Sequence, residues 1–397
     1  MSRFDTICAY ADRQLPLYQD IAGDLHAHPE VGYHEVHACE VLTEQLKKEG
    51  FSVQTDIAGY PTGFTAVYQS GKPGPVLTFL AEYDALPGIG HACGHNLFGP
   101  TSLLAAAALK QVLPETGGEI RVYGTPAEEG GENGSAKASF VREGLFRDVD
   151  AALCVHPGSD YHSLTHEEMA CAPMVVEFFG KASHAAASPQ DGINALDAMI
   201  LLFSSINAMR QQFTSDIRVH GVIDKGGDAP NIIPDYTKAR FFIRAGTVKR
   251  MMNMVKKVEN MVQGAALATG CTWKMEPAQR NLVENIIPTP SFDAVYRKNL
   301  ELLGETVPQL PAVPLGSSDV GNVSQVIPVI QPMIAISDTP VAGHTVEKRD
   351  ACLKQKGLAS IGLGAKALAL TALDLIEQPQ LLESIIREHA AAVAAQQ

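Results

Sequence analysis

The chain has 397 residues, of which 46% are hydrophobic and 19% are charged, and its formal net charge is −13. This size and balance indicate a globular protein with one large domain or two ordinary ones. The negative charge argues against nucleic acid and anionic membrane surfaces as partners, because phosphate binding requires a basic surface.

The seven cysteines are odd in number and scattered along the chain. A disulfide framework is therefore not expected, and a reducing compartment fits better. Charged residues among the first fourteen positions leave no room for the apolar core of a signal peptide, and no uncharged run reaches membrane-spanning length. We therefore expect a cytoplasmic protein.

Apolar residues at helical spacing predict helices over residues 4–49, and Gly50 ends the last of them. Pro29 divides this region in two, because proline cannot continue a helix. Two histidines, His26 and His28, stand at the break. A pair of histidines at a helix boundary is interpreted as surface or capping residues rather than as metal ligands.

Continuous apolar runs predict buried strands, and each run is followed by residues that can bind a metal or move a proton. The run 76–81 precedes Glu82 and Asp84 and then a Gly-containing loop with Cys93 and His95. The other runs are 120–124 before Glu128 and Glu129, 151–155 before His156, and 329–336 before a loop with His344. The segment 97–113 predicts a helix between two of these strands.

Strands that alternate with helices indicate an α/β fold, here a mostly parallel sheet with helices on both faces. Open sheets of this kind bind ligands just beyond the carboxyl ends of their strands. The side chains that follow the four apolar runs are therefore expected to converge on one crevice.

A stretch with a different organisation interrupts this pattern. It predicts strands at 174–179, 218–223, 237–245 and 271–276, and helices at 192–211 and 248–268. The order βαββαβ is that of a ferredoxin-like domain. We therefore predict a catalytic domain in two parts, residues 1–171 and 281–397, which closes with a helix over 359–377. The insert at 172–280 would form a hinged lid.

The strand ends supply five candidate metal ligands, which are too many for one tetrahedral ion. Two divalent ions that share a bridging ligand would use all of them, with a hydroxide held between the ions. Thiolate and imidazole favour zinc over calcium or magnesium, and manganese or cobalt remain alternatives. The five residues are Cys93, His95, Glu129, His156 and His344.

Such a centre also needs a general base that takes a proton from the water and delivers it to the leaving nitrogen. Glu128 is the candidate, since adjacent residues on extended backbone point to opposite sides and Glu129 is already a ligand. The pair Gly130-Gly131 permits a turn here. The alternative interpretations are a buried thiol beside a hydrogen-bonded histidine, and a solvated acidic loop at a helix N-terminus.

Two other classes of protein compete with a hydrolase. One is a non-hydrolytic, metal-containing binder or sensor of acylated amino acids, and the other is a redox protein that uses Cys93. The five-ligand set with an adjacent glutamate favours hydrolysis, because a metal-bound thiolate is already occupied.

Short motifs along nearly the whole chain carry a resemblance to a known family. They are Leu-His-Ala-His-Pro-Glu (25–30), Asp-Ala-Leu-Pro (84–87), His-Ala-Cys-Gly-His (91–95), Pro-Ala-Glu-Glu-Gly-Gly (126–131), Val-His-Pro (155–157), Gly-Lys-Ala-Ser-His-Ala (180–185), Asn-Ile-Ile-Pro (231–234) and Gly-His-Thr (343–345). The chain resembles the dinuclear metallopeptidase family of aminoacylases, hippurate hydrolases, auxin-conjugate amidohydrolases and aminobenzoyl-glutamate hydrolases. The resemblance implies that the five candidates are metal ligands, with Cys93 bridging. It also implies that Glu128 is the base and that a homodimer forms through the lid.

The resemblance also implies roles for residues outside the ligand set. Asp84 would orient a ligand histidine or the metal-bound water. His184 would be an oxyanion donor to the scissile carbonyl, although a lone histidine in such a turn is more often a cap. Asn231 would bind substrate, within the chain or across the dimer, against a role in turn chemistry. Arg244 could bind a substrate carboxylate, and a surface ion pair is its alternative.

Two departures from the family pattern narrow the match. Asn96 follows the Cys-Gly-His motif where most hippurate-type and auxin-conjugate members have Asp, and Glu82-Tyr83 replaces Asp-Met. Together with residues 316–324, these changes are similar to the branch of aminobenzoyl-glutamate hydrolases and a β-alanyl-lysine type dipeptidase. The implied activity is hydrolysis of the amide bond in N-acyl amino acids or dipeptides. His162, His166 and His220 match no motif and are expected to be structural.

Overall fold

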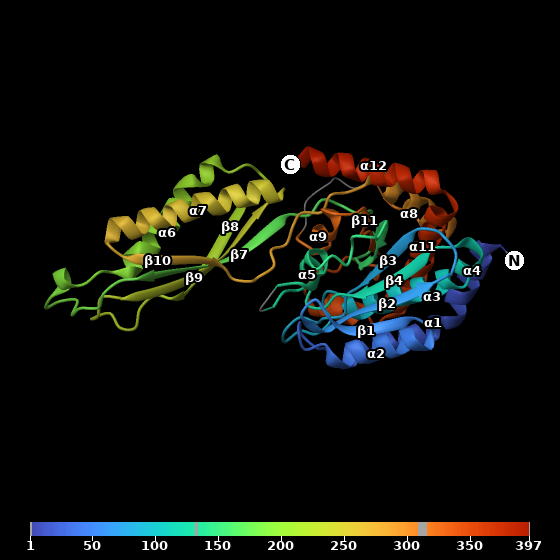
Figure 1. Ribbon diagram of the computed structural model, residues 1–397. Helices are drawn as coiled ribbons and strands as arrows, with labels where there is room; N and C mark the ends of the chain where they lie inside the picture. The colour runs from blue at the N-terminus through green and yellow to red at the C-terminus, as the bar shows by residue number, and fades with distance from the viewer. Residues whose placement is uncertain (1, 132–133, 309–315, 397) are drawn as a thin grey trace. The chain divides into compact units, whose positions relative to one another are not determined.

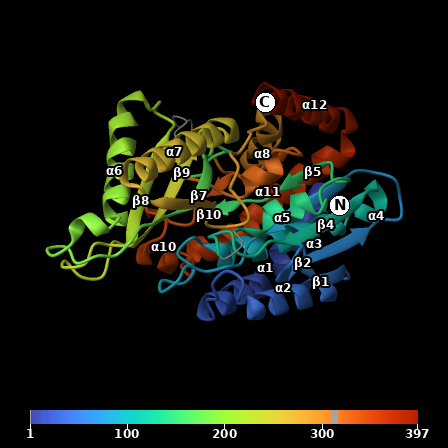
Figure 2. The same ribbon diagram turned by 60° about the vertical axis from the view of Figure 1, so that its left-hand side comes forward.

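The computed structural model describes residues 2–131, 134–308 and 316–396, and they form two compact units. The first unit contains the described residues up to Glu167, from Ile286 to residue 308, and from Asp319 onward. The second contains residues 168–285 with 316–318, so the insert predicted at 172–280 lies within it. Figures 1 and 2 show the elements of both units.

Among the described residues, six strands form the central sheet of the first unit, in the order β1-β2-β4-β3-β5-β11. Strands β4, β3, β5 and β11 are parallel, whereas the hairpin β1–β2 adds an antiparallel edge. The mostly parallel sheet is confirmed, and the hairpin was not expected. The strands are β1 (Ser52–Ile57), β2 (Tyr60–Gln69), β3 (Val76–Ala81), β4 (Glu119–Gly124), β5 (Ala151–Leu153) and β11 (Val329–Ile330).

Helices cover both faces of this sheet, as predicted. Side chains alternate across a strand, so Phe79 packs in the cluster on one face and Leu80 in the cluster on the other. The first face carries α3 (His95–Lys110), α11 (Gln355–Glu377), α1 (Arg3–Ala27) and α8 (Pro290–Leu302), and the second carries α5 (Ala136–Arg142) and α9 (Val320–Ser324). The remaining helices of this unit are α2 (Val36–Lys48), α4 (Leu113–Thr116), α10 (Val346–Ala351) and α12 (Pro379–Gln396).

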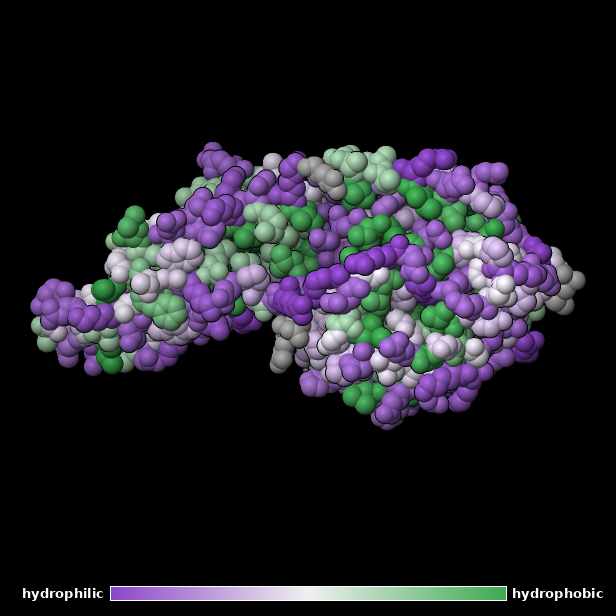
Figure 3. Space-filling model, in the orientation of Figure 1, coloured by the Kyte–Doolittle hydropathy of each residue, from purple (hydrophilic) through white to green (hydrophobic). Residues whose placement is uncertain are grey.

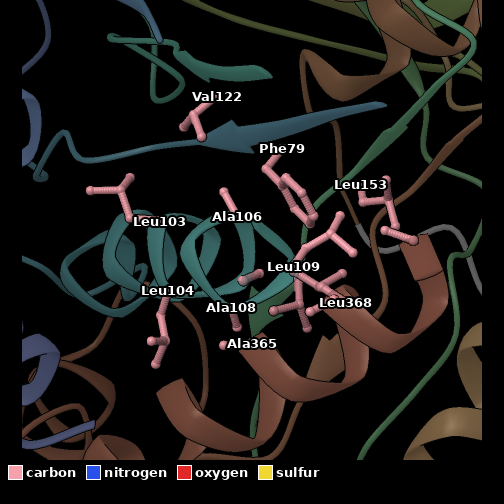
Figure 4. Packing of buried hydrophobic residues seen from close by; sticks show 14 of the residues in the cluster. Phe79, Leu103, Leu104, Ala106, Ala108, Leu109, Val122, Leu153, Ala365 and Leu368 are labelled. Atoms are coloured by element: carbon pink, nitrogen blue, oxygen red, sulfur yellow. The ribbon is translucent and has the colours of Figure 1, made fainter. Parts of the chain in front are cut away.

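Helix α3 lies between the sheet and α11 in the interior of the first unit (Figure 4). Its alanines and leucines are almost all buried, and Leu103 and Leu109 have no exposed surface. Small side chains on α3 and α11 allow the two helices to approach closely, as Ala108 and Ala365 illustrate. This packing holds the first turn of α3, which carries His95, against the end of the sheet.

Helix α11 is long and apolar enough to cross a membrane by length and composition alone. Its most apolar window is 78% buried inside the structure, where it packs against α3 and α1. It is therefore the core helix of a folded unit.

The expected strand at 329–336 is two short strands. Pro332 has no N–H to donate and interrupts the strand, so β11 is followed by β12 (Met333–Ile334). Strand β12 pairs in parallel with β6 (His156–Pro157), and Met333 lies opposite His156. The interruption thereby creates a small second sheet that holds a candidate ligand.

The second unit has the predicted βαββαβ order. Its four-stranded antiparallel sheet has the order β10-β7-β9-β8, and α6 and α7 cover one face. Strand β7 begins four residues earlier than expected, because Ala170 and Cys171 still pair with β9. The elements are β7 (Ala170–Phe179), α6 (Ala195–Met209), β8 (Arg218–Lys225), β9 (Tyr236–Ala245), α7 (Val248–Thr269) and β10 (Thr272–Pro277).

Candidate metal centre

The loop between β3 and α3 presents two of the candidate ligands. Gly94 adopts a left-handed φ of 96° between Cys93 and His95 and caps the N-terminus of α3. A Cβ atom at this position would lie 2.7 Å from Cβ of Pro157, so the glycine also allows the β6 segment to approach. Cys93 is thus held next to His156, with 3.4 Å between Sγ and Nε2.

The five candidate ligands fall into two groups that share Cys93. One group is Cys93, His95 and His156, and the other is Cys93, Glu129 and His344, with the ligand atoms of each group within 4.8 Å of one another. In the second group, Nε2 of His344 lies 3.5 Å from Oε1 of Glu129. The structure therefore brings together all five residues from four strand ends, as the parallel sheet predicts.

The separations between these atoms fit ligands that share an ion. Metal bonds of about 2.0–2.3 Å at tetrahedral angles place two ligand atoms roughly 3.3–3.7 Å apart. The distances of 3.4 Å and 3.5 Å lie in this range. Nε2 of His95 is also buried without a hydrogen-bond partner among the described residues. The donor set of one thiolate, three imidazoles and a carboxylate therefore fits two divalent ions.

Hydrogen bonds fix the tautomers of two candidate ligands. Nδ1 of His95 donates to the carbonyl oxygen and Oδ1 of Asp84, at 2.9 Å and 3.0 Å, and Nδ1 of His156 donates to the carbonyl oxygen of Pro157 at 2.9 Å. In the neutral form that binds a metal, both rings therefore present Nε2 as the electron-pair donor. Asp84 also accepts from the backbone N–H of Glu129 at 3.0 Å. This contact is the kind expected for a residue that orients ligands.

Strong electrostatic coupling marks the centre. Burial raises the pKa of the Cys93 thiol, but the imidazoles of His95 and His156 outweigh it and hold that pKa well below its ordinary value. Burial lowers the pKa of His95, and Cys93 and Asp84 reverse this effect and raise it. Hydrogen bonds to Cys93 and Glu129 raise the pKa of His344 to about 10. These neighbours favour the thiolate form of Cys93, which is the form that binds metals.

The two adjacent glutamates lie in a strained turn. Ala127 has a φ of 57°, which is rare for a residue other than glycine, and its N–H donates to Glu35 at 2.8 Å. The turn lets Glu129 approach His344, while Oε2 of Glu128 lies 3.9 Å from Nε2 of His95. Burial and the charges of Glu82 and Glu129 raise the pKa of Glu128 well above its ordinary value.

Three fully buried charged residues beside this centre were not predicted to take part. Nζ of Lys137 lies 2.8 Å from Oε1 of Glu82 and 2.6 Å from Oδ1 of Asp319. Oε2 of Glu82 lies 3.3 Å from Nε2 of His95. The position of Glu82 at a strand end could have identified it from the sequence, and Asp319 belongs to the segment 316–324 that the family resemblance singled out. Nothing in the sequence points to Lys137, since a lysine on a short helix is ordinarily solvated.

The predicted residues of the second unit are placed within that unit. His184 is exposed, and its Nδ1 accepts from the N–H groups of Ala186 and Ala187 at 3.2 Å and 3.1 Å. The neutral ring therefore carries its proton on Nε2, the tautomer that could donate to an oxyanion. The carbonyl oxygen of Asn231 accepts from Ala185 at 3.0 Å, so His184 and Asn231 lie on adjoining segments.

Arg244 lies on β9, where its Nη1 donates to Ser317 Oγ at 3.3 Å and its guanidinium stacks on Phe242. Its Nε is buried without a hydrogen-bond partner in the described part of the chain. The substrate-binding roles of Arg244, His184 and Asn231 stay predictions.

The other histidines singled out in the sequence lie outside the five-residue centre. His28 is the C-cap of α1 and contacts the carbonyl oxygen of Asp24, while Nε2 of His26 contacts the carbonyl oxygen of Arg349. His162 accepts from the N–H of Ala335, and the His220 ring packs edge-on against a phenylalanine. His166 interacts electrostatically with buried Asp293.

Comparisons with known proteins agree with this centre. Residues 171–269 match the family described as Peptidase dimerisation domain (M20_dimer). The chain is 38% identical over 376 residues to a Xaa-Arg dipeptidase from Mus musculus, in a match that covers 91% of this chain and 86% of the relative. It is 30% identical over 463 residues to a subunit of p-aminobenzoyl-glutamate hydrolase from Escherichia coli, in a match that covers 98% of this chain and 94% of the relative.

The solved structure of a Bacillus subtilis protein shares the fold. That protein is described as a dinuclear metal binding peptidase from the M20 family, and it matches with a TM-score of 0.67 and 18% identity over 92% of this chain and 99% of that one.

Fold, ligand groups and relatives together define a metal-dependent hydrolase of the metallopeptidase and amidohydrolase class. The chain belongs to the M20 family of peptidases. The family resemblance is therefore confirmed, including its link to the aminobenzoyl-glutamate hydrolase branch.

Proposed function

We propose that this protein cleaves the amide bond of dipeptides or N-acyl amino acids at a centre of two divalent ions. The observation that carries the proposal is the position of Cys93, which belongs to both ligand groups, with Glu128 beside them. His95 and His156 would hold one ion, Glu129 and His344 the other, and Cys93 would bridge them.

When bound, the two ions would lower the pKa of a water molecule and polarise the substrate carbonyl. Glu128 would then take a proton from the water and deliver it to the leaving nitrogen. The strained turn supports this role, because it directs Glu129 to His344 and leaves Glu128 on the side of His95. Asp84 fixes the His95 ring and the backbone of Glu129 relative to each other through hydrogen bonds to both.

Zinc is the metal that we propose, because a thiolate ligand favours it over harder cations. For the substrate, we propose a dipeptide or an N-acyl amino acid with a free carboxylate. Support comes from the two named relatives, which are a Xaa-Arg dipeptidase and an aminobenzoyl-glutamate hydrolase. A panel of dipeptides that end in arginine or lysine, together with aminobenzoyl-glutamate, would separate the two specificities.

The substitution Glu128→Gln tests the mechanism. We expect turnover to fall by about 10²–10⁴-fold, the usual contribution of a general base, with both ions retained. The matched variant is Glu129→Gln, which changes the neighbouring carboxylate and should lose metal as well as activity. Product formation is measured by chromatography and metal content by mass spectrometry.

Substantial turnover in Glu128→Gln would remove the proposed mechanism. Ligand-induced thermal stabilisation of the metal-loaded wild-type protein, without product from any member of the panel, would instead indicate a binder or sensor of acylated amino acids.

We further propose that two copies associate through β8 and α6 of the second unit. Strand β8 is an edge strand of its sheet, and unpaired edges readily pair with another chain. Its exposed residues Val222 and Ile223 are apolar, as are Ile200 and Leu201 on α6. A Cβ atom on Gly226 would lie 3.7 Å from Leu196 of α6 and 3.8 Å from Ile223 of β8, so one end of the helix lies near this strand. Hydrophobic residues, drawn in green, are visible on the surface of the second unit in Figure 3. The match to a dimerisation domain supports a second copy as the partner.

A further inference from the structure

The segment between α1 and α2, residues 28–35, contacts the turn that carries the proposed base. Glu35 ends this segment and has no exposed surface. Its Oε1 accepts from the backbone N–H of Ala127 at 2.8 Å, and its Oε2 accepts from the hydroxyl of Thr62 at 3.0 Å. One oxygen of a buried carboxyl group therefore holds the residue immediately before Glu128.

Ala127 needs a contact of this kind. Its φ of 57° lies in the left-handed region, which a residue with a side chain rarely adopts. Such a conformation persists only where the surrounding structure enforces it. The turn directs Glu129 to His344. It leaves Glu128 on the side of His95, so the positions of both glutamates depend on what holds Ala127.

Two glycines let the segment and the turn approach each other. A Cβ atom on Gly32 would lie 2.8 Å from the carbonyl oxygen of Gly130 and 2.9 Å from Cβ of Ala127. A Cβ atom on Gly131 would collide with the ring of Tyr33. Both distances for Gly32 are shorter than van der Waals contact, so the turn packs against the segment as well as donating to it.

The segment is anchored on its other side, independently of the turn. The carbonyl oxygen of Glu30 accepts from the N–H of Ala85, in the loop after β3, at 2.7 Å. The carboxylate of Glu30 accepts from the N–H groups of His37 and Ala38 at 3.0 Å each, and thereby binds the first turn of α2. Glu35 is therefore part of a fixed support rather than of a loop that could follow the turn.

We infer that Glu35 is a positioning residue for the hydrolysis, which holds Ala127 in the left-handed conformation that separates Glu128 from Glu129. This inference rests on the function proposed above. Burial and then the charge of Asp84 raise the pKa of Glu35 to about 7. A carboxyl group keeps an acceptor oxygen whether or not it is protonated, so the contact with Ala127 does not require the charge.

Two substitutions of Glu35 separate the hydrogen bond from the space that the side chain fills. Glu35→Met keeps the length of the side chain and removes both acceptors. In the zinc-loaded variant we expect kcat to fall by about 10–100-fold with KM little changed, because the base is misplaced while substrate binding is not altered. Glu35→Gln keeps an acceptor oxygen for Ala127 and should retain most of the wild-type kcat. Kinetics are measured with the best substrate of the panel above.

Amide hydrogen exchange gives a readout that does not depend on turnover. In metal-free wild-type protein the N–H of Ala127 is protected by its hydrogen bond to Glu35. Exchange at this amide, measured by mass spectrometry at residue resolution, should accelerate by at least about 10-fold in Glu35→Met and stay near wild type in Glu35→Gln. Adding Ala127→Gly to Glu35→Met should recover part of the lost kcat, because glycine adopts a left-handed φ without strain.

Asp293→Leu is the matched control. Asp293 is a buried carboxyl group outside every ligand group of the described residues, and it accepts from the N–H of Thr165 at 3.0 Å. The variant also loses a buried acceptor of a backbone N–H, but it should keep kcat and the protection of Ala127. If Glu35→Met does not fold, Gly32→Ala carries the test and should lower kcat, because the added Cβ atom displaces the turn from the same segment.

Unchanged kcat in folded Glu35→Met, or in Gly32→Ala where that variant replaces it, would overturn the role of Glu35 while the wild type remains active. Equal losses of kcat in Glu35→Met and Asp293→Leu, or in Glu35→Met and Glu35→Gln, would also overturn it, since stability or charge would then be the cause. A wild type that cleaves no member of the panel would instead overturn the proposed function. The exchange experiment on metal-free protein would still decide whether Glu35 holds the turn.

Discussion

A single carboxylate connects the two halves of the proposed metal centre. Oδ1 of Asp84 orients the His95 ring, and Oδ2 accepts from the backbone of Glu129. One side chain therefore sets the distance between a residue of the first ligand group and a residue of the second. Burial raises the pKa of Asp84, and His95 with its hydrogen bond outweighs that effect and keeps the pKa below its ordinary value.

Asp293 is a buried carboxyl group away from the metal centre, and it makes stability depend on pH. Burial raises its pKa to about 7 from an ordinary value of 3.8, and the N–H of Thr165 opposes this only in part. The folded state therefore binds the proton more tightly than the unfolded state. This contribution to stability is complete below about pH 4 and is lost as the pH rises through 7.

The substitution Asp293→Asn removes this titration and should make the protein less sensitive to alkali. We expect the unfolding free energy of the wild type, relative to the variant, to fall by about 3 kcal/mol between pH 5 and pH 8. Urea unfolding of both metal-free proteins at each pH measures the difference, in which the titrations common to both cancel. A difference that is independent of pH, or that rises with pH, would show that Asp293 ionises normally in the folded state.

At the scale of single elements, the start of α3 depends on one glycine. Gly94 has a left-handed φ, and a side chain there would collide with Pro157. Gly94→Ala should therefore lower the unfolding free energy by about 1–3 kcal/mol and weaken metal binding, because Cys93 and His95 flank the strained residue. Thermal unfolding and chelator titration measure the two effects.

The control for this prediction is another glycine-to-alanine change. Gly23 lies inside α1, and a Cβ atom there would meet nothing within 4 Å. Gly23→Ala should raise the unfolding free energy by about 0.5–1 kcal/mol, since alanine is the better helix former. If both variants changed stability in the same direction, local backbone conformation would not be the cause at Gly94.

The elements that carry ligands were predictable because each follows a continuous apolar run. Glu129 and His156 come within five residues of such runs, and parallel strands must end at one edge. The hairpin β1–β2 was missed, since β1 is mostly exposed and its turn at Ala58-Gly59 lacks the Asn-Gly or Asp-Gly signal. The break at Pro332 could have been predicted from the sequence, because proline has no backbone N–H to donate within a sheet.

Lys137 shows where reasoning from sequence ends. Its burial depends on two acids, one 55 residues before it and one 182 residues after it, that the fold brings to the same point. No local pattern records such a meeting. Predicting this cluster therefore requires the three-dimensional structure, whereas the ligands at strand ends follow from the rule that parallel strands end at the same edge of a sheet.

At the scale of the whole molecule, the exposed apolar edge of the second unit predicts self-association. Ile223 on β8 is 43% exposed, and a charged residue at an edge blocks strand pairing. Ile223→Lys should raise the dissociation constant of the dimer at least 10-fold, in line with the roughly 1–3 kcal/mol that an apolar contact residue contributes. Sedimentation velocity over a range of protein concentrations measures it.

The matched control for this surface is Leu267→Lys. Leu267 is 84% exposed on α7, the helix that packs over β7, β9 and β10. This variant should keep the dissociation constant of the wild type, because the added charge lies away from the proposed edge. A wild-type protein that sediments as a monomer, or equal effects of the two lysines, would assign the association to another surface or to none. Loss of the dimer in Ile223→Lys but not in Leu267→Lys is the result expected if β8 pairs with β8 of a second copy.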